Sequence, residues 1–123
     1  MRAGIDSVEI DRIAKSLEIN GFLARVYSSE EIKLLHARNM RPETAAANFA
    51  AKEAFSKALG SGIRGFSLNE VSVLRDELGA PFISLSGKAR EAAGELRFTV
   101  SITHTKSVAT AIVIAYQQQE GFN

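Results

Sequence analysis

Charged and hydroxyl side chains recur along the alanine-rich stretch of residues 43–59, and their types suit binding of a phosphate or a metal ion. At about 100° per residue, one side of a helix here would carry an aromatic and four polar residues: Phe49, Lys52, Glu53, Ser56 and Lys57. The simplest interpretation is a solvated face with an i,i+4 ion pair between Glu53 and Lys57. The ring of Phe49 among these charges indicates instead that another element or subunit covers the face.

A second carboxylate, Asp6, lies in a segment that also holds Ala3, Ile5 and Val8. Because an unpaired buried charge is costly, Asp6 must be exposed, cap the junction with the next element, or bind a cation. Hard divalent cations such as Mg²⁺ bind one or two carboxylates and complete their shells with substrate phosphates. Asp6 and Glu53 are therefore candidate Mg²⁺ ligands, whereas two histidines and no cysteine are too few for a zinc site.

The segment 101–106 places a histidine among hydroxyls and a cation. Its donors suit a phosphate group and come from Ser101, Thr103, His104, Thr105 and Lys106. A lone histidine in a turn is more often structural, so His104 keeps two interpretations at this point. His36 lies on a polar helix face and is expected to be solvated.

Three glycines, Gly60, Gly62 and Gly65, fit the pattern G-x-G-x-x-G. A dinucleotide-binding fingerprint needs a strand before these glycines and a helix after them, but here a helix precedes them and a strand follows. We therefore interpret Gly60 as a helix C-cap. Gly62 and Gly65 could still let a ligand approach the backbone closely.

These residues are positioned by elements of an α+β fold. Strands are predicted over residues 2–8, 70–75, 81–85, 97–103 and 108–116, with hairpin turns at 76–79 and 104–107. Helices are predicted over residues 9–18, 28–38, 42–59 and 86–94. Ser28 and Glu31 form the pattern of a capping box, and Pro42 suits a first helical turn. The central helix should bury one face, made by Ala47, Ala51, Ala54, Phe55 and Ala58.

Length and composition favour one domain over residues 1–123, with 46% hydrophobic residues and no cysteine. Disulfides and thiol nucleophiles are excluded. A net charge of +1 argues against a nucleic-acid-binding face. The sequence shows neither a long apolar run nor a secretory signal, so a cytoplasmic protein with no membrane or nucleic-acid partner is expected.

Three segments carry a resemblance to a known family. Residues 4–13 are G-I-D-S-V-E-I-D-R-I, residues 49–62 are F-A-A-K-E-A-F-S-K-A-L-G-S-G, and residues 101–104 are S-I-T-H. In this order they resemble the G-x-D-x-V-E-I-x-R-I opening, the F-A-A-K-E-A-F-S-K-A-x-G-T/S-G core and the S-I/L-S/T-H hairpin of the bacterial holo-[acyl-carrier-protein] synthases. The middle segment is the longest and most specific. The resemblance spans about residues 3–115.

The resemblance implies a 4′-phosphopantetheinyl transferase fold, with a small antiparallel sheet packed against a long central helix and shorter helices. The implied reaction moves 4′-phosphopantetheine from coenzyme A to a serine of apo-acyl carrier protein and releases adenosine 3′,5′-bisphosphate. Asp6 and Glu53 match the family's Mg²⁺ ligands, with the coenzyme A diphosphate completing the shell. A homotrimer with active sites at subunit interfaces is also implied.

Further roles follow from the resemblance. Asp6, Glu53 and Lys57 would be catalytic, and the base for the serine would be Glu53, Asp6 or a water on the metal. The residues that would bind coenzyme A are Lys52, Lys57, Gly60, Gly62, His104 and Thr105. Arg12, Phe22 and Arg25 match positions that dock the acidic carrier protein.

The chain departs from the family pattern at two positions. Asn48 stands where an arginine usually precedes F-A-A-K-E, so a contact to the coenzyme A phosphates is missing or comes from elsewhere, with Arg41 and Arg64 as candidates. Gly21 stands where a docking arginine is common. Fewer docking charges would chiefly slow carrier capture.

Two other classes of function compete with the enzyme. A non-catalytic module that binds coenzyme A or a nucleotide would share the phosphate-contacting residues, but it would not need two carboxylates. A structural protein would use the alanine-rich helix as an assembly surface only. Mg²⁺-dependent transfer separates the enzyme from both.

Overall fold

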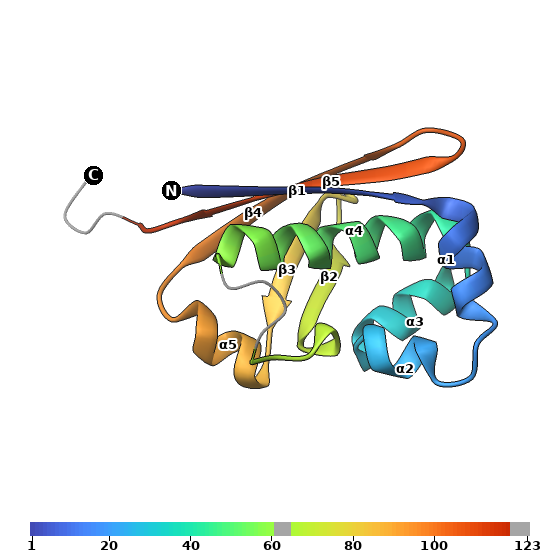
Figure 1. The fold of residues 1–123 in the computed structure, drawn as a ribbon, viewed down its shortest axis with the longest axis horizontal. Coiled ribbons are helices and arrows are strands. Elements are labelled where there is room, and N and C mark those ends of the chain that lie inside the picture. Colours follow the sequence, from blue (N-terminus) through green and yellow to red (C-terminus); the bar gives the residue numbers. More distant parts are fainter. Residues whose placement is uncertain (61–64, 119–123) are drawn as a thin grey trace.

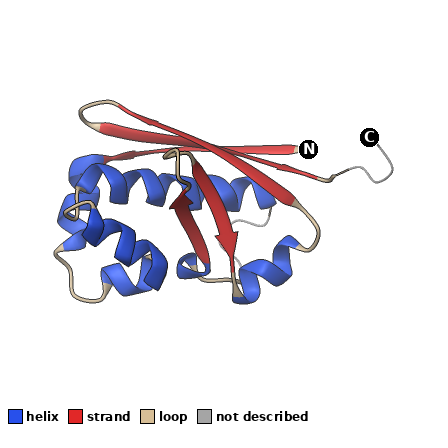
Figure 2. Cartoon of the chain, turned by 180° about the vertical axis from the view of Figure 1, so that it is seen from behind, coloured by secondary structure: helices blue, strands red, loops and turns tan. Residues whose placement is uncertain are grey.

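A central helix, α4 (Pro42–Leu59), organises the fold in the computed structural model, which describes residues 1–60 and 65–118 (Figure 1). One side of α4 is covered by a three-stranded antiparallel sheet in the order β1-β5-β4. The hairpin of β2 and β3 and the shorter helices lie on its other sides (Figures 1 and 2). The predicted α+β class is confirmed, with two small antiparallel sheets in place of one.

The three-stranded sheet joins the two ends of the chain. Its strands are β1 (Arg2–Glu9), β5 (Val108–Tyr116) and β4 (Arg97–His104). Asp6 pairs with Ala111, which pairs with Ile102 on the far strand. The second sheet is a hairpin of β2 (Val71–Arg75) and β3 (Pro81–Leu85).

The remaining helices are short and surround one end and one side of α4 (Figure 1). They are α1 (Ile10–Leu17), α2 (Phe22–Val26), α3 (Ser29–Ala37), the 3₁₀ turn η1 (Leu68–Glu70) and α5 (Gly87–Ala93). The predicted capping box begins α3, because Ser28 Oγ accepts from Glu31 N and Glu31 Oε1 accepts from Ser28 N. The elements α2 and η1 were not predicted, since neither is long enough to show a period.

Strand β1 lies directly on the backbone of α4. A Cβ at Gly4 would clash with the Ala54 carbonyl oxygen and would lie 2.6 Å from Ala58 N and 2.9 Å from Lys57 Cβ. Glycine is therefore required at position 4 for space. This close approach places Asp6 beside the part of α4 that carries Glu53 and Lys57.

The predicted core face of α4 is confirmed, since all five of its residues are buried. The predicted solvated face is wrong at Lys52 and Ser56, whose exposed fractions are 0% and 2%. The reason is that α3, η1 and β2 cover a second side of α4, so that most of its circumference faces protein. Phe49 is half-buried and packs against the core.

Within residues 1–60 and 65–118, the helices all lie on one side of the three-stranded sheet, so its outer face carries no helix there (Figure 2). Ile5 and Ile112 pair across β1 and β5 on this face and are 58% and 37% exposed. Ala3 and Ile114 pair next to them. Among the helices of the described residues, none is long and apolar enough to cross a membrane.

Candidate active site

Asp6, Glu53 and Lys57 form one cluster at the contact between β1 and α4. Lys57 Nζ donates to Asp6 Oδ1 at 3.2 Å and to the Ile5 carbonyl oxygen at 3.0 Å. The Lys57 side chain is 57% exposed and that of Asp6 is 22% exposed, so both reach solvent. Glu53 precedes Lys57 by one helical turn and is half-buried. The structure thus brings together three of the residues that the sequence singled out.

The carboxylates in this cluster are close enough to repel one another. The pKa of Glu53 is raised, first by partial burial and then by the negative charge of Asp6. The charges of Lys57 and Arg12 oppose this rise. A cation bound beside these carboxylates would offset the repulsion that Glu53 experiences.

The donor set of the cluster fits a hard divalent cation. Asp6 and Glu53 supply carboxylate oxygens, which Mg²⁺ prefers, and Mg²⁺ commonly takes only one or two of them from the protein. Within residues 1–60 and 65–118, no group of three or more acidic, histidine or cysteine side chains could hold a metal. The cluster therefore fits an ion that shares its shell with water and substrate oxygens.

Lys52 does not face this cluster. Its side chain is fully buried and its ammonium pairs with Glu31. Nζ also donates to the carbonyl oxygens of Val71 and, at 3.0 Å, of Leu68. Burial lowers the pKa of Lys52 and the Glu31 charge opposes this. With its three donors engaged in the core, Lys52 is a structural residue, and the expectation that it contacts a phosphate is not supported.

His104 lies in a separate, strongly basic hollow. This hollow has a volume of about 310 Å³ and is lined by the arginines Arg38, Arg41 and Arg75 together with His104. One acidic residue, Glu43, also lines it. Two of these arginines, Arg38 and Arg75, were missed by sequence reasoning, because they lie on different elements and no local motif joins them. We refer to this site as the arginine hollow.

The cluster and the arginine hollow lie at different parts of α4. Glu43, Thr44 and Ala47 line the hollow near the start of α4, six to ten positions before Glu53. Asp6 lies on β1 and His104 ends β4, with β5 between the two strands. The two sites are therefore separate in one chain.

The other expected ligand-binding residues lie at chain turns. Gly60 is the C-cap of α4 with a φ of 90°, as predicted, and the Arg2 guanidinium occupies the space where its Cβ would be. Thr105 Oγ1 accepts from the backbone of Ser107 and Val108 and so holds the β4–β5 turn. Gly62 and Arg64 lie outside the described residues.

The expected docking residues are placed at the α1–α2 end of the molecule. Arg12 and Arg25 are exposed and Phe22 is half-buried. Gly21 begins α2 with a φ of 87°, and a Cβ there would lie 2.9 Å from Arg25 Nη1. An arginine at position 21 would be strained in this backbone conformation, which gives the departure from the family pattern a local cause.

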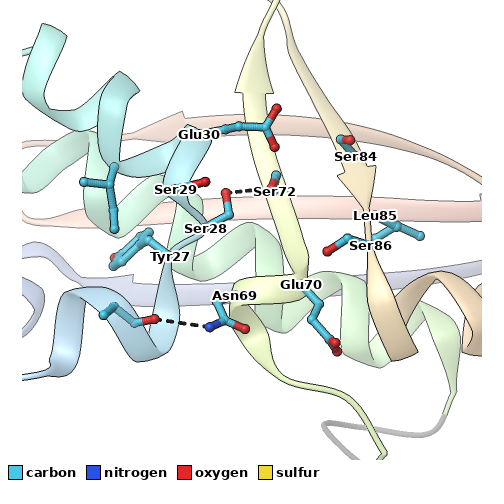
Figure 3. Close-up of a pocket in the computed structure, with 12 residues that line it drawn as sticks. Tyr27, Ser28, Ser29, Glu30, Asn69, Glu70, Ser72, Ser84, Leu85 and Ser86 are labelled. Carbon is cyan, nitrogen blue, oxygen red and sulfur yellow. Dashed lines mark hydrogen bonds between the residues drawn. The ribbon is translucent and has the colours of Figure 1, made fainter.

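A second hollow, of about 580 Å³, lies between α3 and the β2–β3 hairpin (Figure 3). Five serines line it, together with Glu30, Glu70 and Asn69, and Ser72 Oγ donates to Ser28 Oγ at 2.7 Å. Its lining contains neither lysine nor arginine. It therefore lacks the positive charge that a phosphate-bearing ligand needs.

Comparisons with known proteins identify the family of this chain. A model of the 4′-phosphopantetheinyl transferase superfamily matches residues 2–113. A holo-[acyl-carrier-protein] synthase of Clostridium perfringens is 43% identical over 96% of this chain and 92% of its own length. One from Clostridium botulinum is 45% identical over 90% and 93%.

Solved structures show the same fold. The Helicobacter pylori holo-[acyl-carrier-protein] synthase in complex with coenzyme A has a TM-score of 0.82 and 33% identity, covering 93% of this chain and 99% of its own. The Bacillus anthracis enzyme in complex with CoA (3′,5′-ADP) has a TM-score of 0.81 and 32% identity, covering 95% and 96%.

The chain therefore belongs to the 4′-phosphopantetheinyl transferase superfamily and is an enzyme of that class. Its similarity to the holo-[acyl-carrier-protein] synthases over nearly the whole chain confirms the resemblance seen in the three sequence segments.

Proposed function

We propose that this chain transfers 4′-phosphopantetheine from coenzyme A to a serine of an apo-acyl carrier protein, in a Mg²⁺-dependent reaction that leaves adenosine 3′,5′-bisphosphate. The observation that carries the details is the convergence of Asp6, Glu53 and Lys57 from two elements at one solvent-accessible point. Relatives named for this activity, and related structures described as complexes with coenzyme A, support the choice of donor and acceptor.

The chain's own residues have distinct tasks in this proposal. Asp6 and Glu53 would hold Mg²⁺, which supplies positive charge to the diphosphate of coenzyme A when bound. Lys57 is one turn from Glu53 and presents an exposed ammonium that can neutralise charge on the transferring phosphoryl group. Phosphoryl transfer depends mainly on such positioning and charge neutralisation.

The acceptor serine must lose a proton as its oxygen attacks phosphorus. The candidate bases that this chain offers at the cluster are the carboxylates of Asp6 and Glu53. Asp6 already accepts a hydrogen bond from Lys57. The proton is expected to leave on one of these carboxylates or through solvent in contact with them.

A homotrimer with active sites between subunits is part of the proposal. The outer face of the β1-β5-β4 sheet exposes Ile5 and Ile112, and a second copy of this chain would cover them. Because the cluster and the arginine hollow are separate sites in one chain, a ligand shared by two copies could contact the cluster of one and the hollow of the other. Analytical ultracentrifugation tests this, and a monomer would contradict it.

Arg12, Phe22 and Arg25 are proposed to dock the acidic carrier protein. Their placement on α1 and α2 supports this, since Arg12 also lies close enough to Glu53 to lower its pKa. A docked carrier would then have its serine near the cluster. The cytoplasmic location expected from the sequence stays a prediction.

The test is a mass measurement on several apo-carrier proteins incubated side by side with the enzyme, coenzyme A and Mg²⁺. We expect the carrier to gain the mass of phosphopantetheine. Asp6→Ala and Glu53→Ala should abolish this gain, whereas Glu91→Ala on the exposed face of α5 should not. Binding of coenzyme A without transfer would favour the non-catalytic module instead. Near-normal transfer by either carboxylate variant would remove the metal assignment.

A further inference from the structure

The arginine hollow contains a guanidinium that the family pattern does not predict. Arg75 ends strand β2 and lines the hollow with Arg38 and Arg41. Ion pairs within residues 1–60 and 65–118 join Lys52 to Glu31 and Lys57 to Asp6. The three guanidiniums of the hollow are thus not engaged with carboxylates in the described part of the chain.

Arg75 is fixed in place by Asn48. Its Nη2 donates to Asn48 Oδ1 at 3.0 Å, while Nη1 makes longer contacts of 3.4 and 3.3 Å to the carbonyl oxygens of Val73 and Leu74. Asn48 is fully buried, and its Nδ2 donates to Glu31 Oε2 and to the Val73 carbonyl oxygen, both at 2.9 Å. The side-chain oxygen of Asn48 is therefore presented to Arg75 in a single orientation.

We propose that Arg75, held by Asn48, supplies in this chain the phosphate-binding guanidinium that the family pattern places at position 48. The inference rests on the proposed function, because it assigns Arg75 to coenzyme A. Position 48 carries no positive charge in this chain, and the side chain of Arg75, which is hydrogen-bonded to it, carries one. The two earlier candidates were Arg41, which lines the same hollow, and Arg64, which lies outside the described residues.

The chemistry of the hollow favours a phosphate monoester. Three guanidiniums face one carboxylate, and a guanidinium binds phosphate oxygens through two parallel hydrogen bonds. Burial lowers the pKa of Arg75, and the nearby charge of Arg38 lowers it further, so an anion between them would relieve repulsion. Since the diphosphate of coenzyme A is assigned to the Asp6–Glu53 cluster, the 3′-phosphate is the group left for Arg75.

The deciding experiment compares coenzyme A with 3′-dephospho-coenzyme A as donors for wild type and Arg75→Gln. We expect Arg75→Gln to raise the KM for coenzyme A by about tenfold or more, since a hydrogen bond between charged groups is lost. The KM for 3′-dephospho-coenzyme A should change by less than about twofold. Arg75→Lys should recover part of the loss, because a lysine restores the positive charge but not the two parallel hydrogen bonds of a guanidinium. Arg90→Gln, on α5 and lining a different hollow, is the matched control.

A double variant tests directly whether a guanidinium at position 48 can replace the one at position 75. Asn48→Arg combined with Arg75→Gln should bring the KM for coenzyme A back toward that of wild type, and a folded double variant that shows no recovery contradicts the exchange. Circular dichroism establishes whether this variant folds, because Asn48 is buried. If it does not fold, Arg75→Gln alone decides the proposal.

Two outcomes separate this inference from the proposed function. If wild type transfers phosphopantetheine but Arg75→Gln leaves both KM values unchanged, or raises both equally, the role of Arg75 is wrong and the function stands. If wild type transfers nothing, the proposed function is wrong. Calorimetry then still tests whether Arg75 binds the 3′-phosphate. In that measurement adenosine 3′,5′-bisphosphate should bind wild type more tightly than adenosine 5′-monophosphate does, and Arg75→Gln should remove the difference.

Discussion

Lys52 and Glu53 are neighbours on α4 but lie in opposite environments. Lys52 points into the core, where its ammonium contacts Glu31 and two backbone carbonyl oxygens. Glu53 points to the contact with β1, where partial burial and then the charge of Asp6 raise its pKa. The first is a closed network, and no buried side-chain nitrogen or oxygen of the described residues lacks a hydrogen-bond partner. The second is an open cluster that holds two like charges together.

This difference distinguishes, on one helix, a charged residue that stabilises the fold from a charged residue that can bind a ligand. A buried ion pair costs much free energy in desolvation, and its members persist only when hydrogen bonds satisfy them fully. The neighbouring carboxylates of Asp6 and Glu53 repel each other, which makes their cluster a candidate functional site. Charge alone does not distinguish the two residues, whereas their partners do.

The largest effect is expected from Lys52→Met, which should lower the free energy of unfolding by about 3–5 kcal/mol because Glu31 is left buried without its cation. Urea denaturation measures this. The KM for coenzyme A should stay unchanged in the folded variant, since Lys52 does not reach a ligand site. Lys33→Met, on the exposed side of α3, is the control. A stable variant with a raised KM would place Lys52 in the functional region after all.

Tyr27→Phe should cost less, about 1–2 kcal/mol. The Tyr27 hydroxyl is buried and donates to the Ala45 carbonyl oxygen at 2.8 Å, and the ring lies 5.4 Å from Lys52 Nζ. Its pKa is raised by burial and by the Glu31 charge, so the hydroxyl keeps its proton. Thermal unfolding followed by circular dichroism measures the loss. An unchanged unfolding temperature would show that the closed network does not need this hydrogen bond.

Glu53→Gln should leave the protein as stable as wild type or more stable at neutral pH, by less than about 1 kcal/mol. A carboxyl whose pKa is raised by folding costs stability once it ionises, and this cost appears as pH rises through the ordinary range of a glutamate toward the raised value. The gain from Glu53→Gln should therefore grow over that interval and vanish at lower pH. Urea denaturation at several pH values tests this, and a destabilised Glu53→Gln would contradict the comparison.

The smallest effect is expected from Glu70→Gln, at the end of η1. Glu70 accepts from the backbone of Ser67 and Lys88, and these hydrogen bonds lower its pKa. A lowered carboxyl pKa contributes stability above the ordinary glutamate range, and this contribution is lost as pH falls through the lowered value. The unfolding temperature of Glu70→Gln should thus lie slightly below that of wild type at neutral pH and converge with it in acid. Glu77→Gln, at the tip of the exposed β2–β3 turn, is the control.

Much of the fold could be predicted because it depends on local sequence patterns. The capping box at Ser28, the start of α4 at Pro42 and its end at Gly60 all depend on residues close in sequence. The burial of Lys52 was not predictable in this way, because its partners Glu31, Leu68 and Val71 come from three other segments. The hydrophobic periodicity of a helix indicates which residues share a face, but it does not indicate how many faces of that helix other elements cover.

The candidate site shows the same limit. Asp6 and Glu53 were paired on the chemistry of their side chains, and the structure places them together through the contact of Gly4 with α4. The arginine hollow joins the end of α3, the start of α4 and the end of β2. Nothing in the spacing of Arg38, Arg41 and Arg75 indicates this meeting, because tertiary packing alone brings them together.

The pairing of β1 with β5 has a consequence for how the enzyme is made. Among the described strands, β1 has β5 as its one neighbour, and Asp6 pairs with Ala111, roughly a hundred positions later. During synthesis from the N-terminus, β1, which carries Asp6, cannot pair with β5 until nearly the whole chain has been made. A chain that stops before β5 would contain all the residues of the Asp6, Glu53 and Lys57 cluster and still lack the strand that aligns them. Catalytic competence should therefore be among the last properties the nascent protein acquires.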